Sequence, residues 1–162
     1  TGGKAPGASA PATPAARRGG TGDARIHSLT LLDGAGGTLA EAATGAPLVV
    51  RCELTAHARL ESPVLHVALT TAGGAVAWSG STQRGAASIR ALDGPATIDL
   101  RFDALRLLEG DYRLSARLTD ASGATDHDRL DDWCEVRVRG SDPGQSGIAA
   151  LEPSWTVTRQ HR

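Results

Sequence analysis

The chain has 162 residues, 17 Lys and Arg against 18 Asp and Glu, and a formal net charge of −1 at pH 7. A domain of this length buries roughly two thirds of its unfolded surface, so neither a metal nor a disulfide is needed for folding. Its basic residues are scattered along the chain and form no Lys/Arg block, which argues against nucleic acid as a partner. No run approaches the roughly 18 apolar residues of a membrane span.

Residues 1–23 are rich in Gly, Ala, Pro, Ser and Thr and show no apolar period. Such a composition cannot offset the entropy of ordering, so it predicts a flexible linker. The segment lacks the apolar stretch of a signal peptide, and the chain contains no Met. We therefore expect a segment of a longer protein, with a further domain before residue 1, a folded domain over 24–158 and a tail over 159–162.

From Arg25 onward apolar residues alternate with polar ones, and turn signals recur about every ten residues. This pattern predicts an all-β, antiparallel sandwich with Greek-key connections. Gly-containing turns are expected at Asp33–Gly37, Thr71–Gly74, Leu92–Pro95 and Asp120–Gly123, and one short helical turn within Phe102–Gly110. The predicted strands are Arg25–Leu32, Pro47–Ala56, Val64–Thr71, Ala75–Ser81, Ala96–Phe102, Tyr112–Thr119, Trp133–Arg139 and a last one near Ser154–Thr158.

The one tyrosine, Tyr112, follows Leu108 and Gly110 at the start of a predicted strand. This spacing is typical of a tyrosine corner, in which the ring packs inward and the hydroxyl bonds to backbone a few residues upstream. Tyr112 is therefore interpreted as structural. It labels its strand as the sixth of an immunoglobulin-like arrangement.

Alternation places both cysteines in the core, Cys52 with Val50 and Leu54, and Cys134 with Val136. In an immunoglobulin-like sandwich a disulfide would join the Cys52 strand to a position near Leu114, which is not cysteine here. We therefore expect two reduced thiols, and a reducing compartment is favoured over an oxidising one.

No common hydrolase, metalloprotease or phosphate-loop motif occurs, and no cofactor or metal is indicated. The stretch Thr125–Trp133 holds Asp126, His127, Asp128, Asp131 and Asp132. These carboxylates could bind a hard cation or, with His127, serve a sandwich enzyme, but the spacing fits no EF-hand. A solvated acidic turn is the simpler interpretation.

Outward-facing polar side chains converge if the strands of Tyr112 and Trp133 are neighbours. A ring for stacking, surrounded by planar hydrogen-bonding groups, suits a sugar, which has an apolar CH face and a rim of hydroxyls. Trp78 is interpreted as a core or lid ring and kept as a further candidate. An ordinary charged outer face is the alternative. The candidate glycan-binding residues are His66, Trp78, Arg113, Ser115, Arg117, Trp133, Glu135 and Arg137.

The ordered region resembles the C-terminal carbohydrate-binding domain of the ATPase subunit of Wzt-type, polysaccharide-exporting ABC transporters. The resemblance lies in the order and spacing of "IHSLTLLDGAGG", "TGAPLVVRCELTA", "LHVALTTAGGAVAWSGST", "LRLLEGDYRLSARLTDASGATDHDRLDDWCEVRV" and "LEPSW". Cys134, where a phenylalanine is expected, and the bulky Trp78 depart from the family pattern.

The resemblance implies an immunoglobulin-like sandwich that binds an undecaprenyl-linked glycan in the cytoplasm, at the inner face of the membrane, without catalysis. It also implies a homodimer, in some members strand-exchanged, an ATPase domain N-terminal in the same chain, and a membrane subunit of the exporter as partner. The alternative from another functional class is a structural or adhesive module of a secreted protein. A disulfide between Cys52 and Cys134 would favour this alternative.

Overall fold

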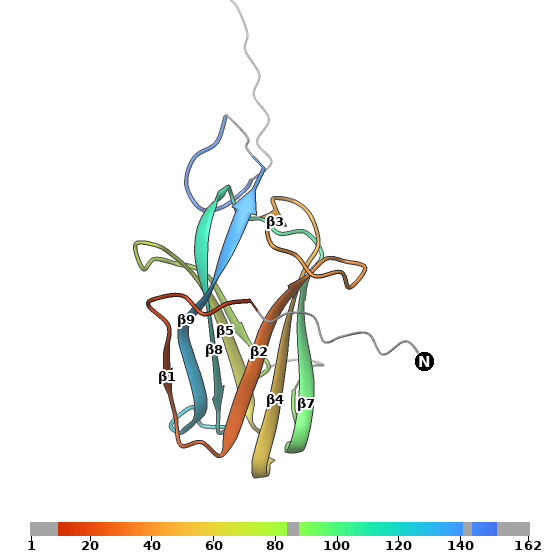
Figure 1. The fold of residues 1–162 in the computed structure, drawn as a ribbon, viewed down its shortest axis with the longest axis vertical. Helices are drawn as coiled ribbons and strands as arrows, with labels where there is room; N and C mark the ends of the chain where they lie inside the picture. The colour runs from red at the N-terminus through yellow and green to blue at the C-terminus, as the bar shows by residue number, and fades with distance from the viewer. Residues whose placement is uncertain (1–9, 84–87, 141–143, 152–162) are drawn as a thin grey trace, which may run out of the picture.

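The computed structural model describes residues 10–83, 88–140 and 144–151, and in these ranges it contains strands and no helix (Figure 1). The elements in chain order are β1 (Arg17–Gly19), β2 (Ala24–Leu32), β3 (Ala42–Ala43), β4 (Leu48–Glu61), β5 (Val64–Thr71), β6 (Val76–Ser81), β7 (Ala91–Phe102), β8 (Gly110–Thr119) and β9 (Asp126–Arg139).

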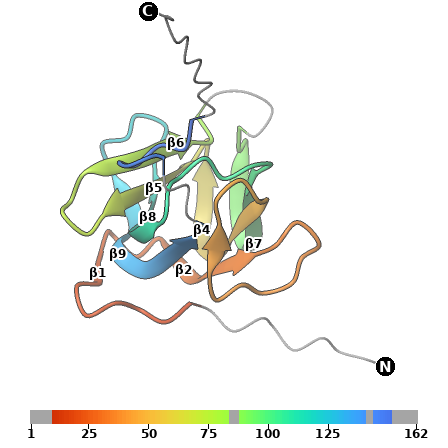
Figure 2. The ribbon, with the colours of Figure 1, turned by 90° about the horizontal axis from the view of Figure 1, so that it is seen from above.

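The strands form two sheets that pack face to face (Figure 2). The larger sheet has the order β1-β9-β8-β5-β6, with β3 beside β9, and the smaller sheet has the order β2-β4-β7. The chain alternates between the sheets from β1 through β5, and it crosses again from β6 to β7 and from β7 to β8. The predicted all-β sandwich is confirmed.

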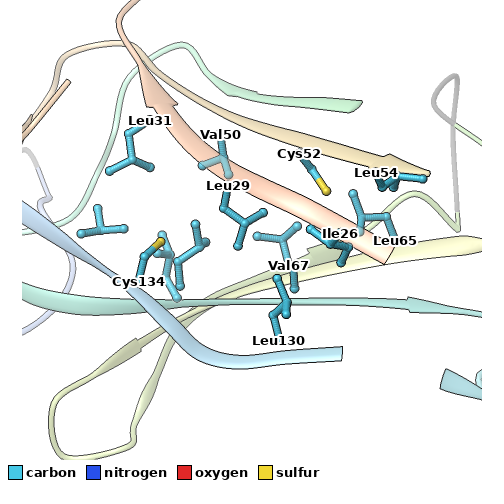
Figure 3. Packing of buried hydrophobic residues seen from close by; sticks show 14 of the residues in the cluster. Ile26, Leu29, Leu31, Val50, Cys52, Leu54, Leu65, Val67, Leu130 and Cys134 are labelled. Atoms are coloured by element: carbon cyan, nitrogen blue, oxygen red, sulfur yellow. The ribbon is translucent and has the colours of Figure 1, made fainter. Parts of the chain in front are cut away.

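The core lies between the two sheets and is built by the period-two alternation of their strands (Figure 3). Along β8, Tyr112, Leu114, Ala116 and Leu118 are buried, as predicted. Cys52 from β4 and Cys134 from β9 point into the same space, and both are free thiols. Burial raises the pKa of each thiol to about 12, so both remain protonated near neutral pH.

The tyrosine corner is present. The Tyr112 hydroxyl donates to the carbonyl oxygen of Leu108 at 2.8 Å, and the ring is buried at the start of β8. The bond satisfies the one polar atom of an otherwise apolar side chain, which allows the ring to remain in the core. Tyr112 therefore fixes the entry into β8 and does not take part in a binding surface.

The N-terminal segment differs from the predicted linker over part of its length. Residues 17–19 form β1, which pairs antiparallel with residues 129–131 of β9. The Arg18 guanidinium bonds to the buried Asp128 carboxylate and to the Ile26 carbonyl oxygen, and Thr13 N donates to Trp133 O at 2.8 Å. The absence of an apolar period in this segment gave no information about these backbone and ionic partners. Residues 10–23 therefore belong to the folded unit.

Two predicted turns are parts of strands. Leu92–Pro95 lies inside β7, where three residues of β4, 57–59, stand opposite Asp93 in a β-bulge and Gly94 has φ 83°. The expectation that glycine at this position adopts a positive φ was correct, but the local structure is a bulge and not a turn. The acidic stretch is likewise the first half of β9, because Asp128 and Leu130 alternate inward against outward-facing neighbours. Phe102–Gly110 contains no helical turn. The strand predicted near Ser154–Thr158 lies outside the described residues.

Candidate functional site

A hollow of about 420 Å³ lies on the outer face of the larger sheet, over β6, β5, β8 and β9. Its volume falls in the range of roughly 300–1,000 Å³ that is usual for small-ligand sites. The outward-facing strand residues of its described lining are His66, Ala68, Ser79, Ser81, Ser115, Arg117 and Asp131, and Gln83, beyond the end of β6, also lines it.

The strand register explains why the face is hollow at this place. Ala68 of β5 stands opposite Ser79 of β6 on one side and Ser115 of β8 on the other. These three short side chains form one row across three strands. The next row along the strands carries His66 between Ser81 and Arg117, and the side chains of His66 and Arg117 are longer than any in the first row. The short row is the floor, and the second row is one wall.

His66 is held in place on this wall by Thr119. Its Nε2 lies 3.2 Å from the Thr119 hydroxyl, and that hydroxyl donates to the carbonyl oxygen of Asp120 at 2.8 Å. Partial burial, and secondly the neighbouring Arg117 guanidinium, lower the pKa of His66, while Asp126 opposes the shift. The imidazole is therefore neutral near neutral pH.

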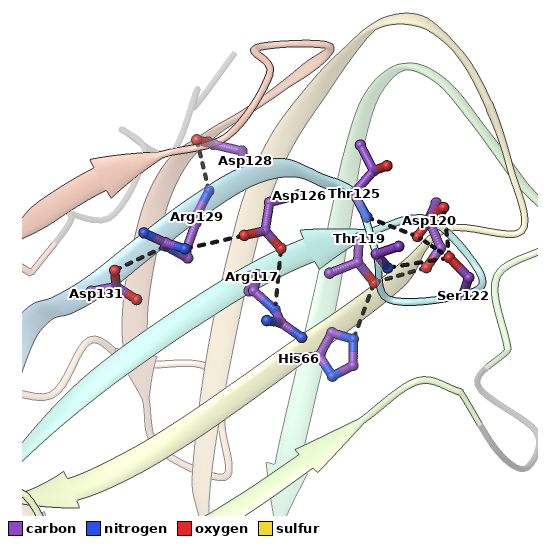
Figure 4. Close-up of polar contacts among 11 residues, drawn as sticks. His66, Arg117, Thr119, Asp120, Ser122, Thr125, Asp126, Asp128, Arg129 and Asp131 are labelled. Carbon is purple, nitrogen blue, oxygen red and sulfur yellow. Dashed lines mark hydrogen bonds and ion pairs between the residues drawn. The ribbon is translucent and has the colours of Figure 1, made fainter.

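The charged residues at the hollow form a network of ion pairs (Figure 4). Asp126 lies between Arg117, at 3.4 Å, and Arg129, at 3.3 Å. Arg129 also contacts Asp131 at 3.0 Å. Arg117 and Asp131 face the hollow, so each presents hydrogen-bonding atoms whose orientation a partner limits.

A second bulge sets the floor on the β9 side. Between the pairs Leu114–Cys134 and Ala116–Leu130, Ser115 stands opposite three residues of β9. The middle one, Asp132, has φ 47°, and its N–H donates to Ser115 Oγ at 2.9 Å. Aspartate tolerates this conformation better than most residues. The bulge thereby orients the Ser115 hydroxyl and brings Asp131 to the hollow.

Three of the predicted site residues, His66, Ser115 and Arg117, meet in the hollow. Sequence reasoning missed Ser79, Ser81, Gln83, Ala68 and Asp131. The alternation of β6 was a usable signal for the two serines, since both share its outward face. The others required the strand register and the β9 bulge, which no local pattern reveals.

Trp78 is an edge ring, as the core-or-lid interpretation expected. Its ring packs against Phe102 of β7, with 4.9 Å between the centroids and an angle of 84° between the planes. It thus closes the gap between β6 of the larger sheet and β7 of the smaller one. A Cβ on Gly80 would lie 2.6 Å from the indole, so this packing requires glycine there. Trp78 does not line the hollow.

Trp133 was expected in the open outward row, and its surroundings differ. The ring packs against the core cluster, and the Arg18 guanidinium carbon lies 5.0 Å from its centroid. Trp133 is the last residue of the β9 bulge, which redirects it toward the sandwich edge, where the N-terminal segment covers it. The aromatic ring that we expected to stack on a sugar is thus absent from the described lining of the hollow.

The remaining predicted residues lie elsewhere on the outer face. Arg113 is 3.9 Å from Asp132 and does not line the hollow. Glu135 and Arg137 pair with each other at 3.1 Å and line a second hollow of about 690 Å³, whose other wall is residues 10–14. That second hollow is lined mainly by Ala, Pro and Leu. Its described polar lining residues are Thr13, Glu41, Glu135 and Arg137, fewer than the polar residues that line the first hollow.

The acidic stretch does not form a metal site. In residues 10–83, 88–140 and 144–151 no group of three or more His, Cys, Asp or Glu side chains is arranged to hold a metal ion. Asp128, the buried member, accepts from Ile26 N at 2.7 Å and from Arg18, so its oxygens serve the fold. The interpretation as a solvated turn was also wrong, because the residues form a strand.

Within the part of the chain that the structure describes, no helix is long and apolar enough to cross a membrane.

The family model of the Wzt C-terminal domain matches residues 15–151. Among solved structures, the crystal structure of the C-terminal domain of Wzt shares the fold with a TM-score of 0.77 and 19% sequence identity, over 91% of each chain. A search of curated protein sequences gives no match. Because the family model spans most of the chain, this chain belongs to the Wzt C-terminal domain family.

Proposed function

We propose that this chain is a non-catalytic glycan-binding module and that the hollow on the larger sheet is its binding site. Membership of the Wzt C-terminal domain family supports a role in an O-antigen ABC transporter. The observation that carries the site is the convergence of His66 and Arg117 beside a floor of short side chains that includes Ser115. Each of the three polar groups is oriented by a second residue, Thr119, Asp132 or Asp126 respectively.

The chemistry of the hollow suits a sugar. Carbohydrate recognition needs hydrogen-bonding groups of fixed direction around the hydroxyl rim and an apolar contact for the CH face. The side chains of His66, Arg117 and Asp131 supply the first, and the methyl group of Ala68 supplies the second. Without an aromatic ring in the described lining, we expect weak binding of one or two sugar units.

In the proposed setting the ligand is an undecaprenyl-linked, O-antigen-like polysaccharide. The module acts in the cytoplasm at the inner face of the membrane, as a homodimer attached to an ATPase domain and working with the exporter's membrane subunit. The alternative, a secreted adhesive module, is not favoured, because Cys52 and Cys134 are free thiols.

The test is titration of the chain with the surface polysaccharide purified from the cells that carry its gene, followed by nuclear magnetic resonance of the backbone amides. We expect binding that perturbs amides of β5 and β8 and is weakened by Arg117→Ala. Arg137→Ala, in the second hollow, is the matched control and should bind normally. Normal binding by Arg117→Ala together with loss in Arg137→Ala would move the site to the second hollow.

A further inference from the structure

The charges that face the hollow are balanced. Among the described lining residues the formally charged ones are Arg117 and Asp131, one of each sign. Both already have a partner, Asp126 for the arginine and Arg129 for the aspartate. In the described part of the chain the hollow therefore presents no uncompensated cation to a ligand.

The same balance holds along the two strands that carry most of the outer charges. Each arginine of β8 and β9 has a carboxylate within 4 Å. The pairs are Arg113–Asp132, Arg117–Asp126, Arg129–Asp126, Arg129–Asp131, Arg137–Glu135, Arg139–Asp111 and Arg139–Glu41. A carboxylate or phosphate on a ligand would have to displace one of these partners before it gained a cation, and would meet Asp131 and Asp126 at close range.

His66 adds a group that accepts hydrogen bonds. The Thr119 hydroxyl uses its single hydrogen to bond Asp120 O, so it must accept the hydrogen of His66 Nε2. The neutral ring then carries a lone pair on Nδ1, which points away from Thr119 (Figure 4). In the described residues no fully buried side-chain nitrogen or oxygen lacks a partner, so the Nδ1 atom, for which no partner is found, is not fully buried, and His66 lines the hollow.

These groups discriminate between kinds of sugar. A hydroxyl can donate to His66 Nδ1 and to Asp131, and it can accept from Arg117. An ionised carboxylate or phosphate can only accept, so it leaves both acceptors of the hollow without a donor. Specificity arises from such unpaired and repelled groups as much as from attraction.

We infer that the hollow selects an uncharged sugar, one of whose hydroxyls donates to His66 Nδ1, and that it rejects sugars that carry carboxylate or phosphate groups. The inference rests on the proposed glycan-binding function and names the substrate class of that same site. His66 is the residue that determines specificity. The Arg117–Asp126 ion pair, called the charge lock below, keeps the arginine from binding an anionic group of a ligand.

The experiment uses one polysaccharide in matched forms. The surface polysaccharide of the cells that carry the gene is titrated after removal of phosphate and reduction of any carboxyl groups, and again after oxidation of its primary hydroxyls to carboxylates. We expect the oxidised form to bind at least about fivefold more weakly than the uncharged form. Equal or stronger binding of the charged form overturns the inference and leaves the proposed function standing. Absence of binding by both forms contradicts the proposed function as well.

A pair of variants separates the charge lock from a change of shape in the oxidised ligand. Asp126→Asn frees Arg117, so it should raise affinity for the oxidised form by roughly two- to fivefold. Asp111→Asn makes the same change of net charge beside Arg139, at the far end of β8, and should leave both affinities unchanged. Equal gains in the two variants would mean that only net charge matters, which overturns the role assigned to Asp126.

The acceptor role of His66 has its own variant. His66→Gln places an amide where Nε2 stood and so can keep the donor to Thr119, while it loses the acceptor at Nδ1. We expect weaker binding of the uncharged form, by roughly two- to tenfold as for one hydrogen bond, with no change in melting temperature. Unchanged affinity with an intact fold would refute the assignment of Nδ1.

Discussion

The outer faces of the two sheets are both polar and ion-paired, yet they differ in what fills their middle rows. On the smaller sheet the central row places Arg51 beside Asp99, and the two side chains form a bidentate pair at 2.8 and 2.7 Å. On the larger sheet the corresponding row is Ser79, Ala68 and Ser115. The difference shows that side-chain length within one register row decides where a sheet face is hollow, whereas polarity and net charge do not.

The largest expected effect comes from filling the short row. Ala68→Phe places a ring on the floor of the hollow, and we expect glycan binding to be lost, by at least about tenfold, because the ligand and the ring compete for the same volume. The change leaves the fold intact, since Ala68 faces outward. Thr97→Phe on the outer face of the smaller sheet is the control. Titration and thermal melting of both variants test the comparison, and binding that survives Ala68→Phe would place the site elsewhere.

Removing one arginine from each face should give smaller effects, on glycan binding for the larger sheet and on stability for the smaller sheet. Arg117→Ala is expected to weaken glycan binding by roughly two- to tenfold, with little change in melting temperature. Arg51→Ala breaks the filled row of the smaller sheet, and we expect slightly lower stability with normal binding, because its pair with Asp99 is solvent-exposed. If both variants lose binding alike, the arginines act through long-range charge, and the two faces are not functionally distinct.

The two faces should also lose stability in different pH ranges. The Arg51 guanidinium holds the pKa of Asp99 below its ordinary value of 3.8. The contribution of this ion pair to folding stability is therefore complete above pH 3.8 and is lost as the pH falls toward the lower pKa of Asp99 in the folded chain. Burial and Arg117 lower the pKa of His66, against the pull of Asp126. As the pH falls below 6.5 the unfolded chain therefore takes up the His66 proton first, and stability declines.

Denaturant unfolding at a series of pH values measures both contributions. His66→Gln should flatten the decline that begins near 6.5, and Asp99→Asn should flatten only the one below 3.8. The residue that faces His66 from β6, Ser81, is uncharged and adds no titration of its own. A decline near 6.5 that persists in His66→Gln would assign it to another histidine.

The smallest difference is expected on the inner faces, where the two sheets are alike. Cys52 from the smaller sheet and Cys134 from the larger sheet are equally buried, and burial raises the pKa of both to about 12. Neither thiol should react with iodoacetamide in the folded chain at mildly alkaline pH, and both should react in denaturant. Mass spectrometry of the two cysteine peptides distinguishes them, and early labelling of one would show that its sheet opens locally.

The sequence was a good guide to the features that depend on local pattern. Period-two alternation predicted the inward rows, both core thiols and, with Gly110 and Leu108, the tyrosine corner. The outward side of β8, with Ser115 and Arg117, was predicted by the same rule. These features need only the residue order within one strand.

What the sequence did not reveal depends on pairing between distant segments. Trp133 was misplaced because two extra residues in β9 redirect it and residues 10–18 cover it. The acidic stretch was interpreted as a turn because its partners, Arg18 and Arg117, lie on other strands. The hollow itself is a property of a row that crosses three strands, and no single strand contains that information.

The β9 bulge has a consequence for how this family member can tolerate insertions and deletions. Because it adds an even number of residues between Leu130 and Cys134, both halves of β9 keep their inward rows, despite the irregularity between them. Removing two residues from residues 131–133 would preserve the facing of the rest of β9, at the expense of the Ser115 contact. Removing one would turn the whole first half of β9 over and bring Arg129 in place of Leu130. An insertion or deletion at this bulge should therefore preserve the inward rows of β9 only if it changes the length by an even number of residues. Changes of two residues would alter the lining of the hollow and leave the core rows in place.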